Sequence, residues 1–282
     1  MKLYVLGNAQ KAGVTAKVER WLPFLREHTE VLCVDLLQER DLTHCAEADM
    51  ALVFGGDGAI LRAARQMAYR QAPVLGVNLG RLGFLADIHP QELHGCLDQV
   101  FAGKFRVTRH LMFECVIEDT KSGLTQTLLG LNELAVHSNP PSHMLHVELD
   151  VDGVTVSRFG GDGLLICTPV GSTAHNLSAG GPVLEQELSA FGITPICPHT
   201  LTNRPIVETA DKQFTIRILG PVPQAIAIVD GQVTIAVTDQ HRIVIRRAPV
   251  CFGLVKMPGR SFYQTLRDKL HWGTTPAYRG EP

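Results

Sequence analysis

A short apolar run that ends at four turn-forming residues constrains the fold of this chain more than any other feature. Residues 51–54 read Ala-Leu-Val-Phe, and Gly55-Gly56-Asp57-Gly58 follows directly, before an Ala- and Arg-rich stretch of helical character. This order predicts a buried strand, a tight turn and the start of a helix. The first backbone N–H groups of a helix have no intrahelical partners, so a turn of this kind can bind an anion.

Asp57 distinguishes this turn from a simple phosphate cradle. Bound phosphates repel a carboxylate unless a divalent cation lies between them, or unless the carboxylate accepts a proton during a reaction. The stretch therefore indicates phosphoryl chemistry, although Gly-Gly-Asp-Gly is also an ordinary turn sequence. It is not the Walker pattern, because no Gly-Lys-Ser/Thr follows. It is not Gly-x-Gly-x-x-Gly either, since no glycine occurs between Gly58 and Gly76.

Apolar runs alternate with helical patterns along the first part of the chain. This alternation predicts a doubly wound parallel α/β sheet, in which ligands bind beyond the carboxyl ends of the strands. Residues 55–58 and 78–84 follow two such ends, and we expect these glycine-rich loops to lie side by side. The expected strands are 2–7, 31–34, 50–54 and 74–78, and the expected helices are 15–27, 44–48 and 59–71.

The pattern becomes β-like near Thr108, which predicts a second, largely antiparallel domain. Asp152-Gly153 and Asp230-Gly231 have the composition of tight hairpin turns. We therefore expect an N-terminal α/β domain over 1–108 and a β-rich, β-sandwich-like domain over 109–258. A last helix at about 259–272, with Ser261 as its N-cap, is expected to pack back on the first domain. The expected β-strands are 113–117, 127–136, 145–151, 164–167, 214–218, 225–229, 233–237 and 242–245.

Composition excludes several classes of protein. Of the 282 residues 45% are hydrophobic and 19% charged, which is ordinary for a globular chain, and the net charge of −2 argues against binding to nucleic acid. No apolar run approaches the roughly 18 residues of a membrane span, and the apolar run at the N-terminus is too short for a signal peptide. Seven scattered cysteines without a Cys-x-x-Cys pair predict reduced thiols in the cytoplasm and no zinc site.

A second unusual stretch covers residues 161–182. An apolar strand runs into Thr168-Pro169-Val170-Gly171-Ser172-Thr173, and a short helix and Ala179-Gly180-Gly181-Pro182 follow. Ser172 or Thr173 is expected to cap the short helix, whose free N–H groups would face a ligand. The small residues leave room for a flat group to approach the backbone.

With both stretches present, the chain resembles the NAD kinases. The resemblance covers nearly the whole chain in the right order. The further segments that carry it are 78–85, 131–133, 194–201, Arg204-Pro205 and Ser261-Phe262-Tyr263 with Leu266, Leu270 and Trp272.

The resemblance implies an α/β domain and a β-rich NAD-binding domain with the active site between them. It implies transfer of the γ-phosphoryl group of ATP to the 2′-hydroxyl of the adenosine ribose of NAD, which gives NADP. Family members are typically homo-oligomers, here a homodimer or homotetramer, and use a divalent metal such as Mg²⁺. No metal ligand set is fixed by the protein alone, although the ion would lie near the phosphates and Asp57.

The resemblance also assigns roles to individual residues. Asp57 would be the general base towards the 2′-hydroxyl. The amides of Gly56 and Gly58 would hold phosphate together with Mg²⁺, and Arg62 would face the site. The residues implied to bind NAD are Asn132 and Glu133 for adenine and ribose, Asp162 for the nicotinamide half, Thr173, Ala174, His175, Asn176, Leu177 and Ser178 for the adenosine pockets, and His143 and Gln232 at positions matched in bacterial members.

Three positions depart from the family pattern, and two other functions remain open. His175 stands where family members often have Tyr, Gly160 where many bacterial members have Arg, and Ala59 where Thr or Asn is common. These departures motivate one alternative, a sensor that binds NAD or NADP without turnover. The other is a lipid kinase with the same glycine turn, although such a kinase is not expected to carry Asn132-Glu133 together with Ser172-Thr173-Ala174.

Overall fold

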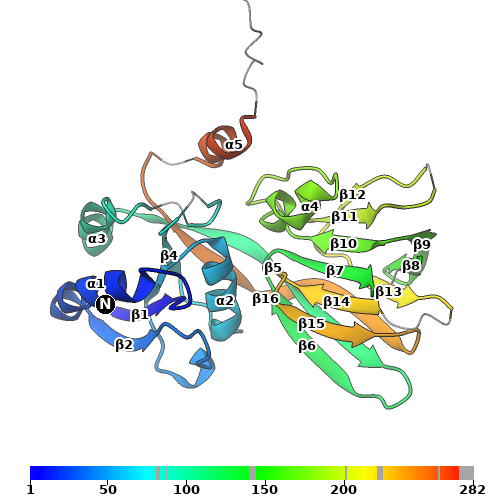
Figure 1. Ribbon diagram of the computed structural model, residues 1–282, viewed down its shortest axis with the longest axis horizontal. Coiled ribbons are helices and arrows are strands. Elements are labelled where there is room, and N and C mark those ends of the chain that lie inside the picture. The colour runs from blue at the N-terminus through cyan, green and yellow to red at the C-terminus, as the bar shows by residue number, and fades with distance from the viewer. Residues whose placement is uncertain are drawn as a thin grey trace, which may run out of the picture.

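The computed structural model of the chain forms two β-sheets with helices on one half of the larger sheet (Figure 1). It describes residues 1–80, 83–86, 88–139, 144–200, 202–220, 225–259 and 261–272. The larger sheet has ten strands in the order β2-β1-β3-β4-β16-β13-β8-β9, with β5 paired to β16 and β6 paired to β5. The smaller has six strands in the order β12-β11-β10-β7-β14-β15.

The N-terminal part confirms the doubly wound parallel α/β fold. Alternate residues of its strands face opposite sides of the sheet, so Leu3 packs beneath α1 and α3 while Tyr4 packs on the side of α2. The four strands β1 to β4 pair in parallel. The elements are β1 Lys2–Gly7, α1 Val14–His28, β2 Glu30–Asp35, η1 Leu42–His44, β3 Met50–Phe54, α2 Asp57–Met67, β4 Val74–Val77 and α3 Leu93–Phe101.

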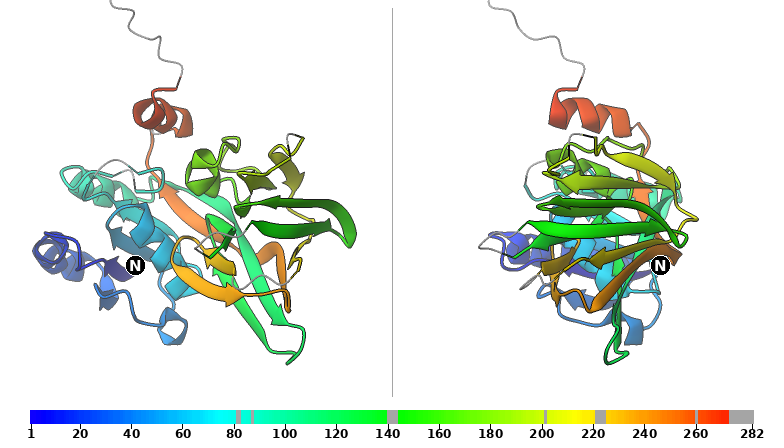
Figure 2. Two further views of the ribbon diagram at one scale, coloured as in Figure 1. Left: turned by 45° about the vertical axis from the view of Figure 1, so that its right-hand side comes forward. Right: turned by 90° about the vertical axis from the view of Figure 1, so that its right-hand side faces the viewer.

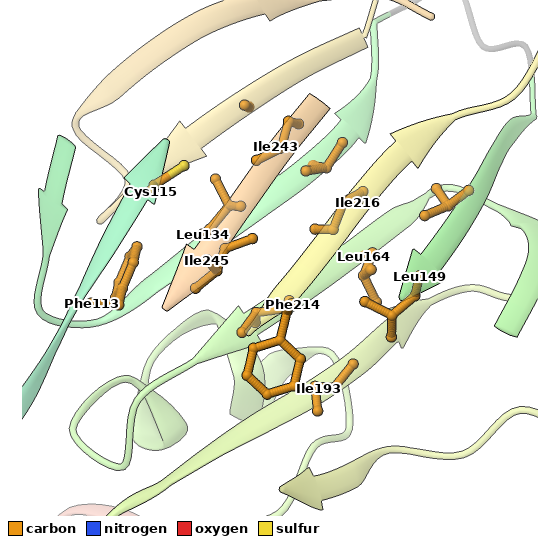
Figure 3. Close-up of a cluster of buried hydrophobic side chains, with 14 of the residues drawn as sticks. Phe113, Cys115, Leu134, Leu149, Leu164, Ile193, Phe214, Ile216, Ile243 and Ile245 are labelled. Carbon is orange, nitrogen blue, oxygen red and sulfur yellow. The ribbon is translucent and has the colours of Figure 1, made fainter. Parts of the chain in front are cut away.

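The C-terminal part confirms a β-rich domain in which two antiparallel sheets enclose one apolar core. Alternating apolar residues from both sheets meet there, among them Phe113 on β5, Leu134 on β7, Leu164 on β10 and Phe214 on β13 (Figure 3). The strands are β5 Arg106–Asp119, β6 Thr125–Gly130, β7 Glu133–Ser138, β8 Leu145–Val151, β9 Val154–Gly161, β10 Gly163–Cys167, β11 Ala190–Ile196, β12 Ile206–Thr209, β13 Phe214–Ile218, β14 Ala225–Val229, β15 Val233–Val237 and β16 His241–Lys256.

One long antiparallel pair joins the two halves. Strand β5 pairs with β16 along nearly its whole length, and the far end of β16 pairs in parallel with β4 at Leu254 and Val74. The near end of β16 pairs with β13 in the β-rich half. The expected boundary at Thr108 therefore falls inside a continuous strand, and the ten-stranded sheet belongs to both halves.

Several expected elements differ from the structure. The helix expected at 44–48 is wrong, because only the short 3-10 helix Leu42–His44 forms and the chain is already extended at Cys45. Helix α2 ends at Met67 rather than 71, since Ala68 adopts a positive φ. The single strand expected at 127–136 is two strands, β6 and β7. Helix α3 and strands β9, β11 and β12 were not expected.

The expected turns and the C-terminal cap are confirmed. Both Asp152-Gly153 and Asp230-Gly231 have positive φ at each residue and connect antiparallel hairpins. Ser261 Oγ accepts a hydrogen bond from the Gln264 amide at 3.2 Å and begins α5, Phe262–Leu270.

Helix α5 lies at the outer end of the molecule in all three views (Figures 1 and 2). It contacts the N-terminal half through Phe84, whose ring centroid lies 6.3 Å from that of Phe262 and 4.2 Å from Lys269 Nζ. No helix in the described ranges combines the length and the apolar character that a bilayer span needs.

Candidate active site

Asp57 connects the glycine turn to the neighbouring loop after β4. It is the first residue of α2, and its carboxylate accepts backbone N–H groups from Phe84 at 2.9 Å and from Leu85 and Ala86 at 3.0 Å each. A Cβ on Gly83 would lie 2.0 Å from Asp57 Oδ1, so only glycine allows the loop to approach this closely. The two glycine-rich loops therefore lie side by side, as the strand order predicts.

Arg62 and Arg65 place two cations on α2, one turn apart. The Nε of Arg62 is buried and has no hydrogen-bond partner among the described residues, whereas Arg65 Nη1 donates to Gln232 Oε1 at 2.8 Å. Burial lowers the pKa of Arg65, and the charge of Arg62 lowers it further. Two guanidinium groups in a partly buried position with few protein acceptors favour an anionic ligand.

Asn132 and Glu133 lie where β6 ends and β7 begins. Their backbone N–H groups donate to the carboxylate of Asp230, at 2.7 Å for Asn132 and 3.2 Å for Glu133. These bonds, with that of Leu131, explain why the chain interrupts its sheet pairing at 131–132. A Cβ on Gly171 would lie 2.1 Å from the Asn132 carbonyl oxygen, so the second glycine-rich stretch packs directly on this segment.

Glu133 and Asp230 are two buried carboxyl groups that influence each other. Burial raises the pKa of Glu133 to about 8, and the nearby Asp230 raises it too, while the backbone N–H of His175 opposes the rise. Burial also raises the pKa of Asp230 to about 6, against the lowering effect of its three backbone N–H donors. At neutral pH Asp230 is therefore ionised and Glu133 protonated, because Asp230 has the larger number of donors.

Gln232 lies between the β-rich half and the glycine turn. Its Nε2 donates to the Gly58 carbonyl oxygen at 2.9 Å and its Oε1 accepts from Arg65. Asp230, which accepts the N–H groups of Asn132 and Glu133, lies two residues before Gln232. One hairpin turn therefore connects the segment predicted for adenosine with the turn predicted for phosphate.

The segment 171–178 forms two short helical turns, η2 Gly171–Thr173 and α4 His175–Ser178. The expected cap is wrong. Ala174 occupies the N-cap position, and the Ser172 and Thr173 hydroxyls donate instead to the carbonyl groups of Pro169 and Val170. Asn176 is fully buried, with its amide bonded to Thr194, Ser172 and Pro182. Leu177 and Ser178 lie on α4 beside it.

Four polar side chains gather between α4, β7 and the ends of β10 and β11. The rings of His137 and His175 stack with their centroids 5.3 Å apart and 15° between their planes. Burial lowers the pKa of His137, and the proximity of His175 lowers it further while Asp162 raises it. The Cys197 thiol bonds to Asp162, which raises the pKa of the thiol.

The positions that depart from the family pattern have local explanations. Ala59 is 4% exposed and its methyl group packs in the core, so this position presents no side chain to a phosphate. A Cβ on Gly160 would lie 2.6 Å from Met144 Sδ, and Arg158 bonds to Glu148 at 2.5 Å. His143 lies outside the described residues. Gly56 and Gly58 both have open space where a Cβ would point.

Comparison with known families matches both halves of the chain. Residues 9–105 match the ATP-NAD kinase N-terminal domain, and residues 131–257 match the ATP-NAD kinase C-terminal domain. The chain belongs to the NAD kinase family. The predicted resemblance is therefore confirmed, and this membership contradicts the lipid-kinase alternative.

Individual NAD kinases support this assignment. The chain is 40% identical to the NAD kinase of Rhodopirellula baltica over 99% of this chain and 89% of that protein. It is 35% identical to that of Desulfatibacillum aliphaticivorans over 93% and 98%. The NAD kinase from Archaeoglobus fulgidus, solved in complex with ATP, has a TM-score of 0.76 and 29% identity, with 96% of this chain and 98% of that one covered. Yeast NADH kinase, solved with NADH, shares the fold with a TM-score of 0.87 at 21% identity, over 100% and 90%.

Three residues at this candidate site were not singled out from the sequence. Asp230 reads as a turn residue, and only its burial reveals that it holds the Asn132-Glu133 segment. Arg65 reads as one of several helix cations, and no sequence signal marks its bond to Gln232. His137 lies in an apolar strand, where a lone histidine gives no indication of its stack with His175.

Proposed function

We propose that the site around the Gly-Gly-Asp-Gly turn carries out the family reaction with Asp57 as its general base. As a member of the NAD kinase family the chain is a phosphotransferase that phosphorylates NAD with ATP. The 2′-hydroxyl of the adenosine ribose gives its proton to the Asp57 carboxylate, and its oxygen forms a bond to the γ-phosphorus. The bond from that phosphorus to the β–γ bridging oxygen breaks, and ADP and NADP result.

The position of Asp57 carries this proposal. Three backbone N–H groups fix the orientation of its carboxylate at the first residue of α2, next to the helix N-terminus that favours phosphate. Its Oδ1 accepts two of these bonds and its Oδ2 one, so Oδ2 retains acceptor capacity for a hydroxyl proton. Gly56 and Gly58 leave the surface of the turn open for phosphate, and Arg62 adds a charge that offsets that of the transferring group.

The acceptor segment suits adenosine. Glu133, protonated at neutral pH, can both donate and accept a hydrogen bond, and Asn132 offers an amide with the same capacity. We assign these two residues to the adenine and ribose, and Asp162 to the nicotinamide half. His175 and its neighbours Thr173, Ala174, Asn176, Leu177 and Ser178 are assigned to the walls of the adenosine site, where the His175 ring supplies a stacking face.

Mg²⁺ fits this site as a companion of ATP rather than as a resident ion. Within the part of the chain that the structure describes, no three His, Cys, Asp or Glu residues are placed to hold a metal. Mg²⁺ usually keeps several waters and takes one or two carboxylates together with substrate phosphates, and Asp57 supplies a carboxylate within the glycine turn itself. When bound, the ion neutralises charge on the phosphates.

We further propose a homodimer or homotetramer in the cytoplasm. The outermost strands β9 and β12 expose Val154 at 67%, Val156 at 49% and Val207 at 48%, and such apolar edges favour contact with a second copy. All seven cysteines are free thiols, which suits a reducing compartment.

A coupled assay tests the proposal. The protein is incubated with NAD, ATP and Mg²⁺, and NADP is detected with an NADP-specific dehydrogenase. We expect wild-type turnover, and we expect Asp57→Asn to lower kcat by at least about 100-fold while NAD binding stays within a few-fold. Asp152→Asn, at the hairpin between β8 and β9, is the matched control and should keep full activity. Full activity of Asp57→Asn would exclude the base, and binding of NAD without product by the wild type would favour the sensor.

A further inference from the structure

The turn between β14 and β15 contacts both halves of the proposed site through two of its side chains. Asp230 accepts the backbone N–H groups of Leu131 at 2.9 Å and Asn132 at 2.7 Å, and thereby holds the segment assigned to adenosine. Gln232 donates to the carbonyl oxygen of Gly58, in the turn assigned to phosphate. In the sequence these two contacts are separated only by Gly231.

The direction of the Gln232 amide follows from the chemistry of its neighbours. A guanidinium group can only donate, so the atom facing Arg65 must be the carbonyl oxygen Oε1. The atom facing the Gly58 carbonyl oxygen must then be Nε2, because an oxygen there would be repelled. Arg65 therefore orients Gln232 so that it can hold Gly58.

Backbone hydrogen bonds on both sides of the turn restrict the separation of the two contacts. Asp230 and Gly231 have φ values of 52° and 64°, and both sides of the turn carry backbone hydrogen bonds, from Asp230 N to the Glu133 oxygen at 2.9 Å and from Gln232 N to the Val229 oxygen at 3.0 Å. Asp230 is 8% exposed, and its carboxylate accepts backbone N–H groups of the neighbouring segment. Figure 1 shows α2, which carries Gly58 and Arg65, between the parallel strands and the β-rich half.

We propose that the Asp230-Gly231-Gln232 turn aligns the ribose-binding segment with the phosphate turn, and that Asp230 and Arg65 are positioning residues for phosphoryl transfer. This inference rests on the proposed function, because it requires Asn132 and Glu133 to hold the acceptor and Asp57 to face it. Asp230 sets the position of the acceptor segment. Arg65 acts on the phosphate turn through its hydrogen bond to Gln232. In-line transfer depends on the match between the position of the acceptor segment and that of the phosphate turn.

The first test separates Arg65 from a merely structural role. Arg65→Met is expected to lower kcat about tenfold, the ratio that corresponds to one lost hydrogen bond to a charged group, with the dissociation constant of NAD within about twofold. Gln232→Met loses both of its hydrogen bonds and should lower kcat at least as much. Because Arg65 acts through Gln232, the double variant should be no slower than Gln232→Met alone. Arg65→Lys, which can still donate to Oε1, should recover part of the lost kcat.

The second test addresses Asp230. Asn tolerates positive φ and favours this kind of turn when followed by glycine, so Asp230→Asn keeps the hairpin while it removes the charge that three N–H groups face. We expect the KM for NAD to rise about tenfold, with a smaller change in kcat. Asp152→Asn makes the same exchange in the other Asp-Gly hairpin and should leave both constants unchanged.

The outcomes separate this inference from the proposed function. Absence of NADP with the wild-type protein would refute the proposed function. The wild type could be active while the Arg65→Met/Gln232→Met double variant has a kcat lowered about a hundredfold, the product of the two single effects. That result would refute alignment through Gln232 alone. An unchanged KM for NAD in a folded Asp230→Asn variant would refute the role of Asp230.

Discussion

Two hairpin turns of this protein have the same residues and nearly the same backbone, but hold their aspartates in different surroundings. Asp152-Gly153 has φ values of 49° and 81°, and Asp230-Gly231 has 52° and 64°. The Asp152 carboxylate is exposed, pairs with Lys212 at 2.9 Å and accepts one backbone N–H, that of Gln213 at 2.9 Å. The Asp230 carboxylate is buried and accepts N–H groups from the neighbouring strand connection. Local sequence therefore determines the turn, whereas tertiary packing determines what its side chain does.

The largest expected difference between the turns lies in their tolerance of alanine. Asp230→Ala leaves three backbone N–H groups without their acceptor, two of them buried, and we expect it to lower the free energy of unfolding by about 4 kcal/mol. Asp152→Ala, with the same positive φ and hence the same backbone strain, should cost much less because water replaces its contacts. Urea unfolding of both variants measures this. Equal losses would mean that strain rather than burial dominates.

The two aspartates should also give pH dependences of opposite sign. Burial raises the pKa of Asp230 to about 6, so the stability that it contributes is present at low pH and is lost as the pH rises from about 4 to about 6, by on the order of 3 kcal/mol in total. The amide of Gln213 and the charge of Lys212 lower the pKa of Asp152, so its contribution is lost as the pH falls below about 4.

Unfolding measured from pH 2 to 7 for the wild type and for each Asp→Asn variant tests these signs. Relative to Asp230→Asn, the wild type should lose stability as the pH rises. Relative to Asp152→Asn, it should lose stability as the pH falls. The same sign at both turns would contradict the difference in burial.

A smaller effect concerns the acid beside the buried turn. Burial and Asp230 raise the pKa of Glu133 to about 8, so NAD should bind less tightly as the pH rises through 8 and the donor proton is lost. We expect the dissociation constant of NAD to rise by up to about tenfold between pH 7 and 9. Glu133→Gln keeps a donor at every pH and should remove this dependence. Calorimetric titrations of both proteins measure it, and a parallel rise in the variant would assign the dependence to another group.

The smallest effect is expected at the exposed turn. Lys212→Met removes the partner of Asp152 in a solvated ion pair, and such pairs contribute little. The thermal midpoint should move by less than about 2 °C, with unchanged kinetics. A larger shift would show that the exposed turn is as important for stability as the buried one.

The same contrast explains how much could be predicted from the sequence. Strands 2–7, 50–54 and 225–229, the hairpin turns and the Ser261 cap follow from local patterns, because apolar periodicity and turn chemistry act over a few residues. The break at 131–132 could not be predicted, since it depends on Asp230 far along the chain. Edge strand β9 exposes half of its residues and gives a weak apolar pattern. The Asp57 bonds to the loop after β4 depend on tertiary proximity, although both loops are recognisable as glycine-rich.

Strand β16 completes the parallel sheet from the opposite end of the chain. During synthesis the N-terminal half emerges first. Strand β16, which lies beside β4 on the side away from β3, is made only after the rest of the β-rich half. Until then the edge of β4 at Val74 lacks its strand partner, although Ile88 already bridges Val77, and the contact that covers it joins distant parts of the polypeptide. A shortened polypeptide that stops before β16 therefore lacks the strand that completes the sheet in both halves of the protein.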